Sequence, residues 1–240
     1  MAEKYLSLVI PVYNEQKIVK KTLSVVLNFL KSKKYTWEVV VVDDGSRDNT
    51  VRLAQKYTRK GVKVVKLQKN SGKGAALREG IKNSNGKLVI YTDCDLSVPI
   101  EYVDKFVKQL EKGSDLVIGS RRVVGSKIAV HQPIIRETMG RVFTFLTQKI
   151  LQTKLADFTC GFKGYKGEVG RTLFAKGKVD RWAYDSEILF LANHSGYKIV
   201  EMPVEWYNRK DSRVNLKRVV LESFLDLIKI RINNFKGRYN

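Results

Sequence analysis

Short apolar runs that polar residues do not interrupt place the strongest constraint on how this chain folds. Residues 39–42 are consecutive valines, a pattern expected of a strand that is buried on both faces. Similar runs recur through the first half of the chain and alternate with helix-like segments, which is typical of a doubly wound, mostly parallel α/β sheet. We predict strands at residues 6–12, 37–42, 62–67, 88–91 and 116–118, and helices at residues 17–31, 50–59, 74–83 and 101–111.

The second half of the chain is less regular. Residues 136–151 and 215–235 have the spacing of helices, and residues 198–206 alternate like a half-buried strand. No linker, internal repeat or low-complexity stretch separates the two halves. Because 240 residues suit one hydrophobic core, we expect a single domain over residues 1–240.

The formal net charge of +21 calls for an anionic partner or neighbourhood. Nucleic acid, an anionic membrane and a phosphorylated substrate all satisfy that requirement. A nucleic-acid-binding protein is the main non-enzymatic alternative, but the basic residues are dispersed and no recognition motif is present. We therefore expect no nucleic acid partner.

Two carboxylates, Asp93 and Asp95, follow the apolar run at residues 87–92. Alternate residues of an extended segment point the same way. Mg²⁺ and Mn²⁺ use one or two carboxylates and leave the remaining positions to a diphosphate. Acidic residues that end a strand also form turns and helix caps, so the pair alone leaves a metal site and a structural turn both open.

Other polar loops follow the predicted strands, at the edge where ligands bind α/β sheets. Asp43–Ser46 can form a turn and cap the next helix, which leaves one of its two aspartates free to accept a bond from a base. Asn70–Gly74 is a turn of small residues that carries a cation and suits a phosphate. It is not a P-loop, and the dinucleotide-binding glycine pattern is also missing.

Taken together, these loops resemble those of family 2 inverting glycosyltransferases. The resemblance implies the GT-A fold, a Rossmann-like sheet that binds a nucleotide sugar. It also implies that Asp44 reads the base, that Lys73 lies near the phosphates, and that Asp93 and Asp95 hold Mg²⁺ or Mn²⁺. The segments that carry the resemblance are Pro11–Glu15, Val42–Ser46, Asn70–Gly74 and Asp93–Asp95, and the donor-binding residues implied are Pro11, Tyr13, Glu15, Asp43, Asp44, Asn70, Lys73 and Asp93.

The second half resembles one branch of that family. Asp157–Lys163 and Arg181–Glu187 are similar to segments of dolichyl-phosphate β-glucosyltransferases, whose near relatives are dolichyl-phosphate mannosyltransferases. In the mannosyltransferases a Gln often lies two residues after the second metal-binding Asp, where this chain has Ser97. The resemblance favours inverting transfer of glucose from UDP-glucose to a polyprenyl phosphate and leaves open mannose from GDP-mannose. Residues 1–120 would bind the donor and residues 121–240 the acceptor.

The acceptor phosphate needs cations, and guanidinium groups present a rigid fork to its oxygens. Arg121 and Arg136, with Lys163 and Arg181, are the candidates to supply them. A phosphate whose second pKa is about 6 is already nucleophilic at neutral pH, so Asp185 would orient Arg181 or close the site. A hydroxyl acceptor would instead need a base, for which Asp185 is the candidate.

Two of the predicted helices, at residues 136–151 and 215–235, mix apolar and basic residues. Such helices can lie in a membrane interface or simply cover their own core. Apolar stretches fall far short of the roughly 20 residues that span a bilayer, and the first residues lack a secretory pattern. We expect a cytoplasmic protein that binds the cytoplasmic face of an anionic membrane peripherally. Its oligomeric state and its need for a membrane-protein partner stay open.

Overall fold

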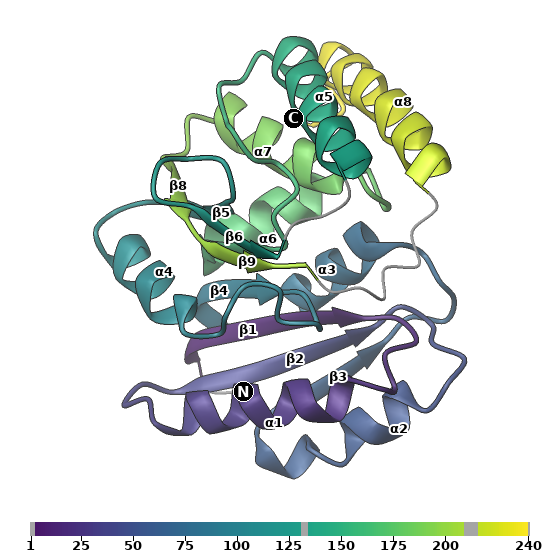
Figure 1. Ribbon diagram of the computed structural model, residues 1–240. Coiled ribbons are helices and arrows are strands. Elements are labelled where there is room, and N and C mark those ends of the chain that lie inside the picture. The colour runs from purple at the N-terminus through teal and green to yellow at the C-terminus, as the bar shows by residue number, and fades with distance from the viewer. Residues whose placement is uncertain (1–2, 131–133, 209–215, 240) are drawn as a thin grey trace.

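A seven-stranded sheet forms the centre of the protein, in the order β3-β2-β1-β4-β7-β5-β8 (Figure 1). The computed structural model describes residues 3–130, 134–208 and 216–239. Neighbouring strands are parallel, except that β7 runs antiparallel to both β4 and β5. The predicted α/β class is confirmed. The strands are β1 (Lys4–Val12), β2 (Trp37–Asp43), β3 (Val62–Lys66), β4 (Gly86–Thr92), β5 (Leu116–Ser120), β7 (Phe162–Lys166) and β8 (Ile199–Pro203).

Helices cover both faces of this sheet, which explains the uninterrupted apolar runs. Leu8 and Ile10 of β1 belong to the core on one face, whereas Val9 between them belongs to the core on the other. Burying a side chain of this size contributes about 1.5–3 kcal/mol. The first core includes residues of α1 (Val19–Lys31), α2 (Thr50–Gln55) and α4 (Tyr102–Glu111), and the second includes residues of α3 (Lys73–Lys82), α6 (Gly167–Lys176) and α7 (Tyr184–His194).

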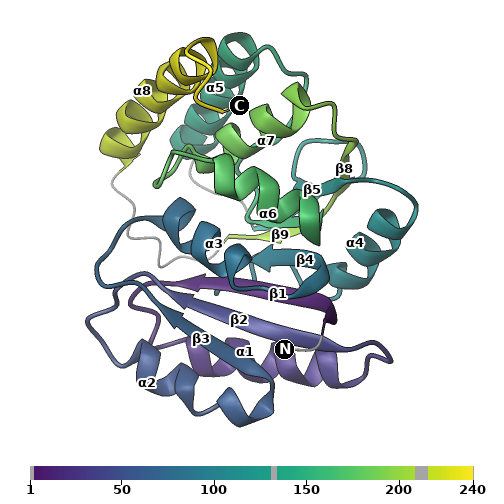
Figure 2. The same cartoon turned by 180° about the vertical axis from the view of Figure 1, so that it is seen from behind.

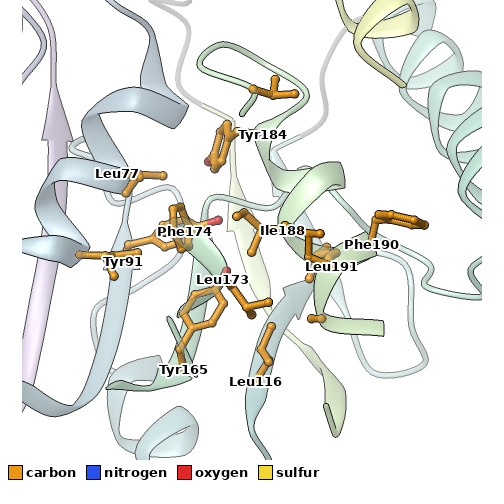
Figure 3. Packing of buried hydrophobic residues seen from close by; sticks show 14 of the residues in the cluster. Leu77, Tyr91, Leu116, Tyr165, Leu173, Phe174, Tyr184, Ile188, Phe190 and Leu191 are labelled. Carbon is orange, nitrogen blue, oxygen red and sulfur yellow. The ribbon is translucent and has the colours of Figure 1, made fainter. Parts of the chain in front are cut away.

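Aromatic rings pack against one another in the second core (Figure 3). The Phe174 ring on α6 meets the Tyr165 ring edge-on, with centroids 5.8 Å apart, and meets the Tyr91 ring in the same way at 6.5 Å. Edge-to-face pairs of this kind stabilise beyond the area that they bury. The packing holds α6 and the central strands β4 and β7 in one unit, and α7 belongs to the same core.

The central strand β7 is the main feature absent from the predicted pattern. Its sequence, Phe-Lys-Gly-Tyr-Lys, has two lysines and a glycine and lacks the apolar run of its neighbours. Gly164 fits because a Cβ there would lie only 3.2 Å from Ile90 and Phe106 atoms. Lys163 is buried through an ion pair. Both conditions depend on residues far away in the sequence.

The strand predicted at residues 198–206 is divided between two sheets. Its first part is β8, which pairs with β5 of the main sheet. Its second part is β9 (Glu205–Tyr207), which pairs with β6 (Lys127–Val130) in a separate two-stranded sheet. Pro203 has no N–H group to donate at the point of division. The helix predicted at residues 50–59 also ends early, at Gln55, and a 3-10 turn (Thr58–Lys60) follows it.

The two helices predicted in the second half are confirmed as α5 (Ile134–Leu151) and α8 (Leu216–Phe235). They lie side by side at the end of the molecule away from α1 and α2, as both views show (Figures 1 and 2). Among the described residues, no helix is both long enough and apolar enough to span a bilayer.

Candidate functional site

Hydrogen bonds join the loops that follow β1 and β2 at the carboxyl edge of the sheet. The Asn14 N–H donates to Ser46 Oγ at 2.8 Å, and the Arg47 N–H donates to Asn14 Oδ1 at 2.9 Å. Asn14 has φ of 55°, a left-handed conformation that Asn adopts more readily than most residues. Tyr13 next to it is 42% exposed. The loop therefore presents an aromatic ring beside the predicted donor loops.

Asp44 organises the loop that follows β3. Its carboxylate accepts bonds from the Asn70 side-chain amide at 2.9 Å, the Ser71 N–H at 2.7 Å and the Gly72 N–H at 2.9 Å. Burial raises the pKa of Asp44, while the two backbone bonds act to lower it. A carboxylate has about four acceptor positions, so one remains for a ligand. Base reading by Asp44 stays a prediction.

Asp43 has a different task. Its carboxylate accepts the Ser46 N–H at 3.1 Å and is almost fully buried. This is the turn that the sequence suggested for one of the two aspartates. Asp43 therefore shapes the loop in which Asp44 lies, and its role in donor binding stays a prediction.

Lys73, Asp93 and Asp95 form the charged centre of the edge. Lys73 Nζ lies 2.5 Å from Asp93 Oδ1. Burial acts to lower the pKa of Lys73, but the carboxylates of Asp93 and Asp185 outweigh it and raise that pKa. The Ser97 N–H holds Asp95 at 2.9 Å. Burial, and then the charge of Asp93, raise the pKa of Asp95, so the two carboxylates repel each other.

This pair of carboxylates fits a divalent cation that a ligand helps to hold. A dication between Asp93 and Asp95 would relieve their repulsion, and the Lys73 ammonium already meets part of that need. In the described part of the chain, no cluster of three or more His, Cys, Asp or Glu side chains is placed to hold a metal. Most coordination positions would fall to diphosphate oxygens and water.

The segment Asp157–Gly161, called the strap below, lies against this centre. A Cβ added to Gly161 would lie 1.9 Å from Asp93 Oδ2, so only glycine leaves room for that carboxylate. At the other end of the strap, Asp157 forms a bidentate pair with Arg121, with Nε–Oδ2 and Nη2–Oδ1 distances of 2.8 and 2.9 Å. Thr159 Oγ1 accepts a further bond from Arg121 Nη2 at 2.8 Å. The strap thus connects the carboxylate pair to Arg121.

The buried Asp157–Arg121 pair should make stability depend on pH. Burial acts to raise the pKa of Asp157, but Arg121 and its hydrogen bonds outweigh it and hold that pKa well below its ordinary value of 3.8. Asp157→Asn should lower the free energy of unfolding by about 3 kcal/mol at neutral pH. Since the native pKa is depressed, this difference should be constant above about pH 5 and shrink as the pH falls below the ordinary value. Urea unfolding at several pH values measures it, and a difference that grows toward low pH would contradict it.

Arg122 is a cation of this site that the predicted residue set did not include. A Cβ on Gly140 of α5 would lie 3.4 Å from Arg122 Nη2, so the guanidinium lies against that helix. Burial, and the charges of Arg121 and Arg141 against that of Asp157, lower the pKa of Arg122. These three arginines are called the arginine cluster below. Arg121 and Arg122 are neighbours in the sequence, and the sequence alone does not say which of the two faces a ligand. Arg136 lies on α5, and its side chain is outside the described part.

Lys163 is placed where it does not meet a phosphate. Its side chain is 0% exposed, and its ammonium donates to Phe158 O at 3.0 Å, Cys160 O at 2.6 Å and Asp185 Oδ1 at 2.8 Å. These bonds use all three N–H groups of a lysine. The placement conflicts with the prediction that Lys163 clamps the acceptor phosphate, because the sequence did not show that β7 lies inside the sheet.

Asp185 and Arg181 are also placed differently from the prediction. Asp185 is buried, and its Oδ1 accepts the Tyr91 hydroxyl at 2.5 Å as well as Lys163. It therefore orients Lys163, where an Arg181 partner was expected. Arg181 is exposed and lies beside the predicted donor loop at residues 70–74, where a Cβ on Gly72 would be 2.9 Å from its Cγ. Its charge acts to lower the pKa of Asp44.

The sheet, the carboxylate pair at its edge and the arginine cluster beyond define an α/β enzyme of the GT-A type. The fold matches that of glucosyl-3-phosphoglycerate synthase from Mycobacterium tuberculosis, solved with Mn²⁺, UDP-glucose and phosphoglyceric acid, with a TM-score of 0.70. That match covers 95% of this chain and 79% of the other at 18% identity, and it shows the fold alone. The model of glycosyl transferase family 2 matches residues 7–174, and the chain belongs to this family. The predicted family and the GT-A fold are confirmed.

Sequence similarity to known proteins extends over nearly the whole chain. A dolichyl-phosphate beta-glucosyltransferase of Trichomonas vaginalis is 36% identical over 99% of this chain and 76% of its own length. A human protein of the same name is 32% identical over 98% of this chain and 78% of its own length. The similarity therefore includes the strap and the arginine cluster as well as the donor loops.

Proposed function

We propose that this protein transfers glucose from UDP-glucose to a dolichyl-type polyprenyl phosphate, with inversion at the anomeric carbon. The observation that carries the proposal is the similarity to dolichyl-phosphate beta-glucosyltransferases over 99% of the chain. The geometry agrees with it, because a carboxylate pair suited to a metal diphosphate lies beside arginines suited to a second anion. Residues 1–120 would bind the donor and residues 121–240 the acceptor, within one domain.

The donor would lie along the loops at the carboxyl edge of the sheet. Asp93 and Asp95 would hold Mg²⁺ or Mn²⁺, which supplies charge stabilisation to the departing diphosphate when bound. Tyr13, Pro11 and Glu15 would surround the base and ribose. Lys73, which lies beside Asp93, would contact the diphosphate through its own charge.

The acceptor phosphate would lie at the arginine cluster. One of its oxygens forms the new bond to the anomeric carbon while the bond from that carbon to the UDP oxygen breaks. The nucleophile arrives as an anion and UDP leaves as one, so no proton is transferred and no base is required. This agrees with the burial of Asp185 and its engagement with Lys163 and Tyr91.

A direct test offers the purified protein UDP-glucose, GDP-mannose and other nucleotide sugars, with a short polyprenyl phosphate and Mg²⁺ or Mn²⁺. We expect a lipid-linked glucose, detected by mass, from UDP-glucose alone. Transfer from GDP-mannose would replace the proposed donor. Transfer to a polyprenol but not to its phosphate would replace the proposed acceptor and return Asp185 to the role of base. No lipid product from any donor with folded protein would refute the function.

Arg122→Gln should separate acceptor binding from donor binding. We expect the KM for polyprenyl phosphate to rise about tenfold, because one charge-assisted contact to the phosphate is lost, while the KM for UDP-glucose changes less than twofold. Initial rates at varied acceptor and donor measure both constants. Lys108→Gln removes the same charge from an exposed position on α4 and should leave both constants unchanged. An equal rise in both KM values would argue against a phosphate contact at Arg122.

A membrane surface is the proposed location of the acceptor, and α5 and α8 are the elements that would meet it. Phe145 on α5 and Leu225 on α8 are 56% and 57% exposed, beside the basic residues Arg141, Lys149 and Lys229 of the same helices. Exposed apolar side chains flanked by basic ones favour an anionic lipid interface. Binding to the cytoplasmic face of the membrane remains a prediction.

Phe145→Glu should weaken binding to anionic vesicles about tenfold, since it replaces an apolar contact with a charge that the lipid repels. Sedimentation with phosphatidylserine-containing vesicles measures the bound fraction. Val25→Glu is the matched control, because Val25 is 39% exposed on α1, at the opposite end of the molecule from α5 (Figure 1). An equal loss of binding in both variants would mean that general charge, and not the α5 surface, governs the association.

A further inference from the structure

Lys163 is a buried cation that the proposed reaction does not use. A lysine ammonium taken out of water carries a desolvation cost of several kcal/mol, and here the cost is offset by Asp185 and two backbone carbonyls. The residues paired with Lys163 on the neighbouring strands, Tyr91 and Ile118, are buried and carry no charge that would stabilise the ammonium. The question is what this ammonium holds in place.

The two carbonyls that Lys163 binds both belong to the strap. Phe158 O and Cys160 O lie between its ends, at 3.0 and 2.6 Å from Nζ. One end is Asp157, which fixes the Arg121 guanidinium through two bonds. The other end is Gly161, whose backbone touches the Asp93 carboxylate. Holding the middle of the strap therefore fixes the position of Arg121 relative to Asp93.

Asp185 extends this connection to the donor loop. It lies in the first turn of α7, and the chain just before that helix packs against the glycines of residues 72–74. The Ala75 N–H donates to Asp180 O at 3.0 Å, and a Cβ on Gly74 would lie 2.6 Å from the Tyr184 Cβ. The Lys163–Asp185 pair thus lies where the donor loop, the strap and the carboxylate pair converge.

We infer that Lys163 is a positioning residue. Through the strap it sets the distance between Asp93 at the donor site and Arg121 at the acceptor site, and it touches neither substrate. The acceptor part of this inference rests on the proposed function. A methionine has similar volume but no N–H group, so it would leave two buried carbonyls without a donor and the Asp185 carboxylate without its cation, with only the Tyr91 hydroxyl still bonded to it. The strap would then relax, and both of its ends would move.

The experiment compares Lys163→Met with Lys166→Met. Lys166 lies on the same strand and also pairs with an aspartate, Asp115, at 2.7 Å, but it makes no contact with the strap. Calorimetry measures UDP affinity in the presence of Mn²⁺, and initial rates measure glucosyl transfer, both at a temperature where each variant is folded. We expect Lys163→Met to weaken Mn²⁺-dependent UDP binding about tenfold and to lower kcat about a hundredfold, while Lys166→Met changes each less than twofold.

Asp185→Asn is the second variant, for the case that Lys163→Met does not fold. It keeps an acceptor for the Tyr91 hydroxyl but removes the charge that anchors Lys163, and we expect Mn²⁺-dependent UDP affinity to fall about threefold. A catalytic base at Asp185 would leave UDP affinity unchanged. Wild-type UDP affinity in both folded variants would overturn the inference. UDP binding needs no acceptor, so failure of the native protein to glucosylate polyprenyl phosphate would refute the proposed function and leave this comparison standing.

Discussion

Asp93→Asn is expected to lower kcat for glucosyl transfer about a thousandfold, equivalent to ~4 kcal/mol of transition-state stabilisation. Asp93 is the carboxylate that Lys73 contacts at 2.5 Å and that Gly161 leaves room for. Replacing it removes one of the two proposed metal ligands and the charge that holds Lys73. Stability should change little, because both partners of the ion pair are partly exposed. Initial rates across a Mn²⁺ titration measure the loss, together with thermal unfolding.

The matched control is Asp104→Asn. Asp104 also carries an ion pair, with Lys33 at 2.6 Å, and its side chain is exposed on α4, away from the carboxyl edge of the sheet. Transfer by this variant should match that of the native protein. If Asp93→Asn kept more than a tenth of native activity, or if excess Mn²⁺ restored it fully, the carboxylate pair would not be the centre of the donor site.

Gly161→Ala should lower kcat about a hundredfold, although the change adds a single methyl group. That methyl would lie 1.9 Å from Asp93 Oδ2, far closer than two non-bonded atoms can approach. The strap cannot retreat easily, because Lys163 and Arg121 hold it on either side, so the Asp93 carboxylate must move. A displacement of about 1 Å in a reacting constellation costs on the order of a hundredfold in rate. Rates and Mn²⁺-dependent UDP affinity should fall together.

Gly196→Ala separates this effect from a general cost of replacing glycine. Gly196 has φ of +74°, and a Cβ there would meet no heavy atom within 4 Å. The variant should lose about 1–2 kcal/mol of stability through backbone strain and keep native kcat. Native activity in Gly161→Ala, at equal or lower stability than Gly196→Ala, would show that the carboxylate has more room than the structure allows.

Local patterns are enough to predict the fold of residues 1–120. The valines of β2 and the apolar residues of β1 and β4 are buried by helices on both faces, and such burial leaves a signature in consecutive residues. The loops that end these strands were also identifiable, because parallel strands bring their carboxyl ends to one edge. Tyr13, Asp44, Lys73 and Asp93 belong to these loops or lie next to them, and the resemblance to family 2 glycosyltransferases assigns them to one site.

Residues 121–240 are less predictable because their key contacts join segments that are distant in the sequence. Arg121 is anchored by Asp157, 36 residues away, and Lys163 by Asp185, 22 residues away. Neither pair has a spacing that a helix or a strand would impose. Lys163 was accordingly assigned to the acceptor phosphate from its charge, and Arg122 received no role although it adjoins α5. Lys163 is buried and Arg122 is exposed, and this difference is not visible in a local pattern.

The α/β class, the order of the polar loops and the family can be predicted from the sequence, since each depends on periodicity or on short motifs whose residues lie close together in the chain. The position of β7 between β4 and β5 becomes visible only in the folded structure. That insertion buries Lys163, brings Gly161 against Asp93 and lays the strap between the carboxylate pair and Arg121. An antiparallel strand of mixed polarity is stabilised by the neighbours that surround it, and those neighbours are assembled only when the whole chain has folded.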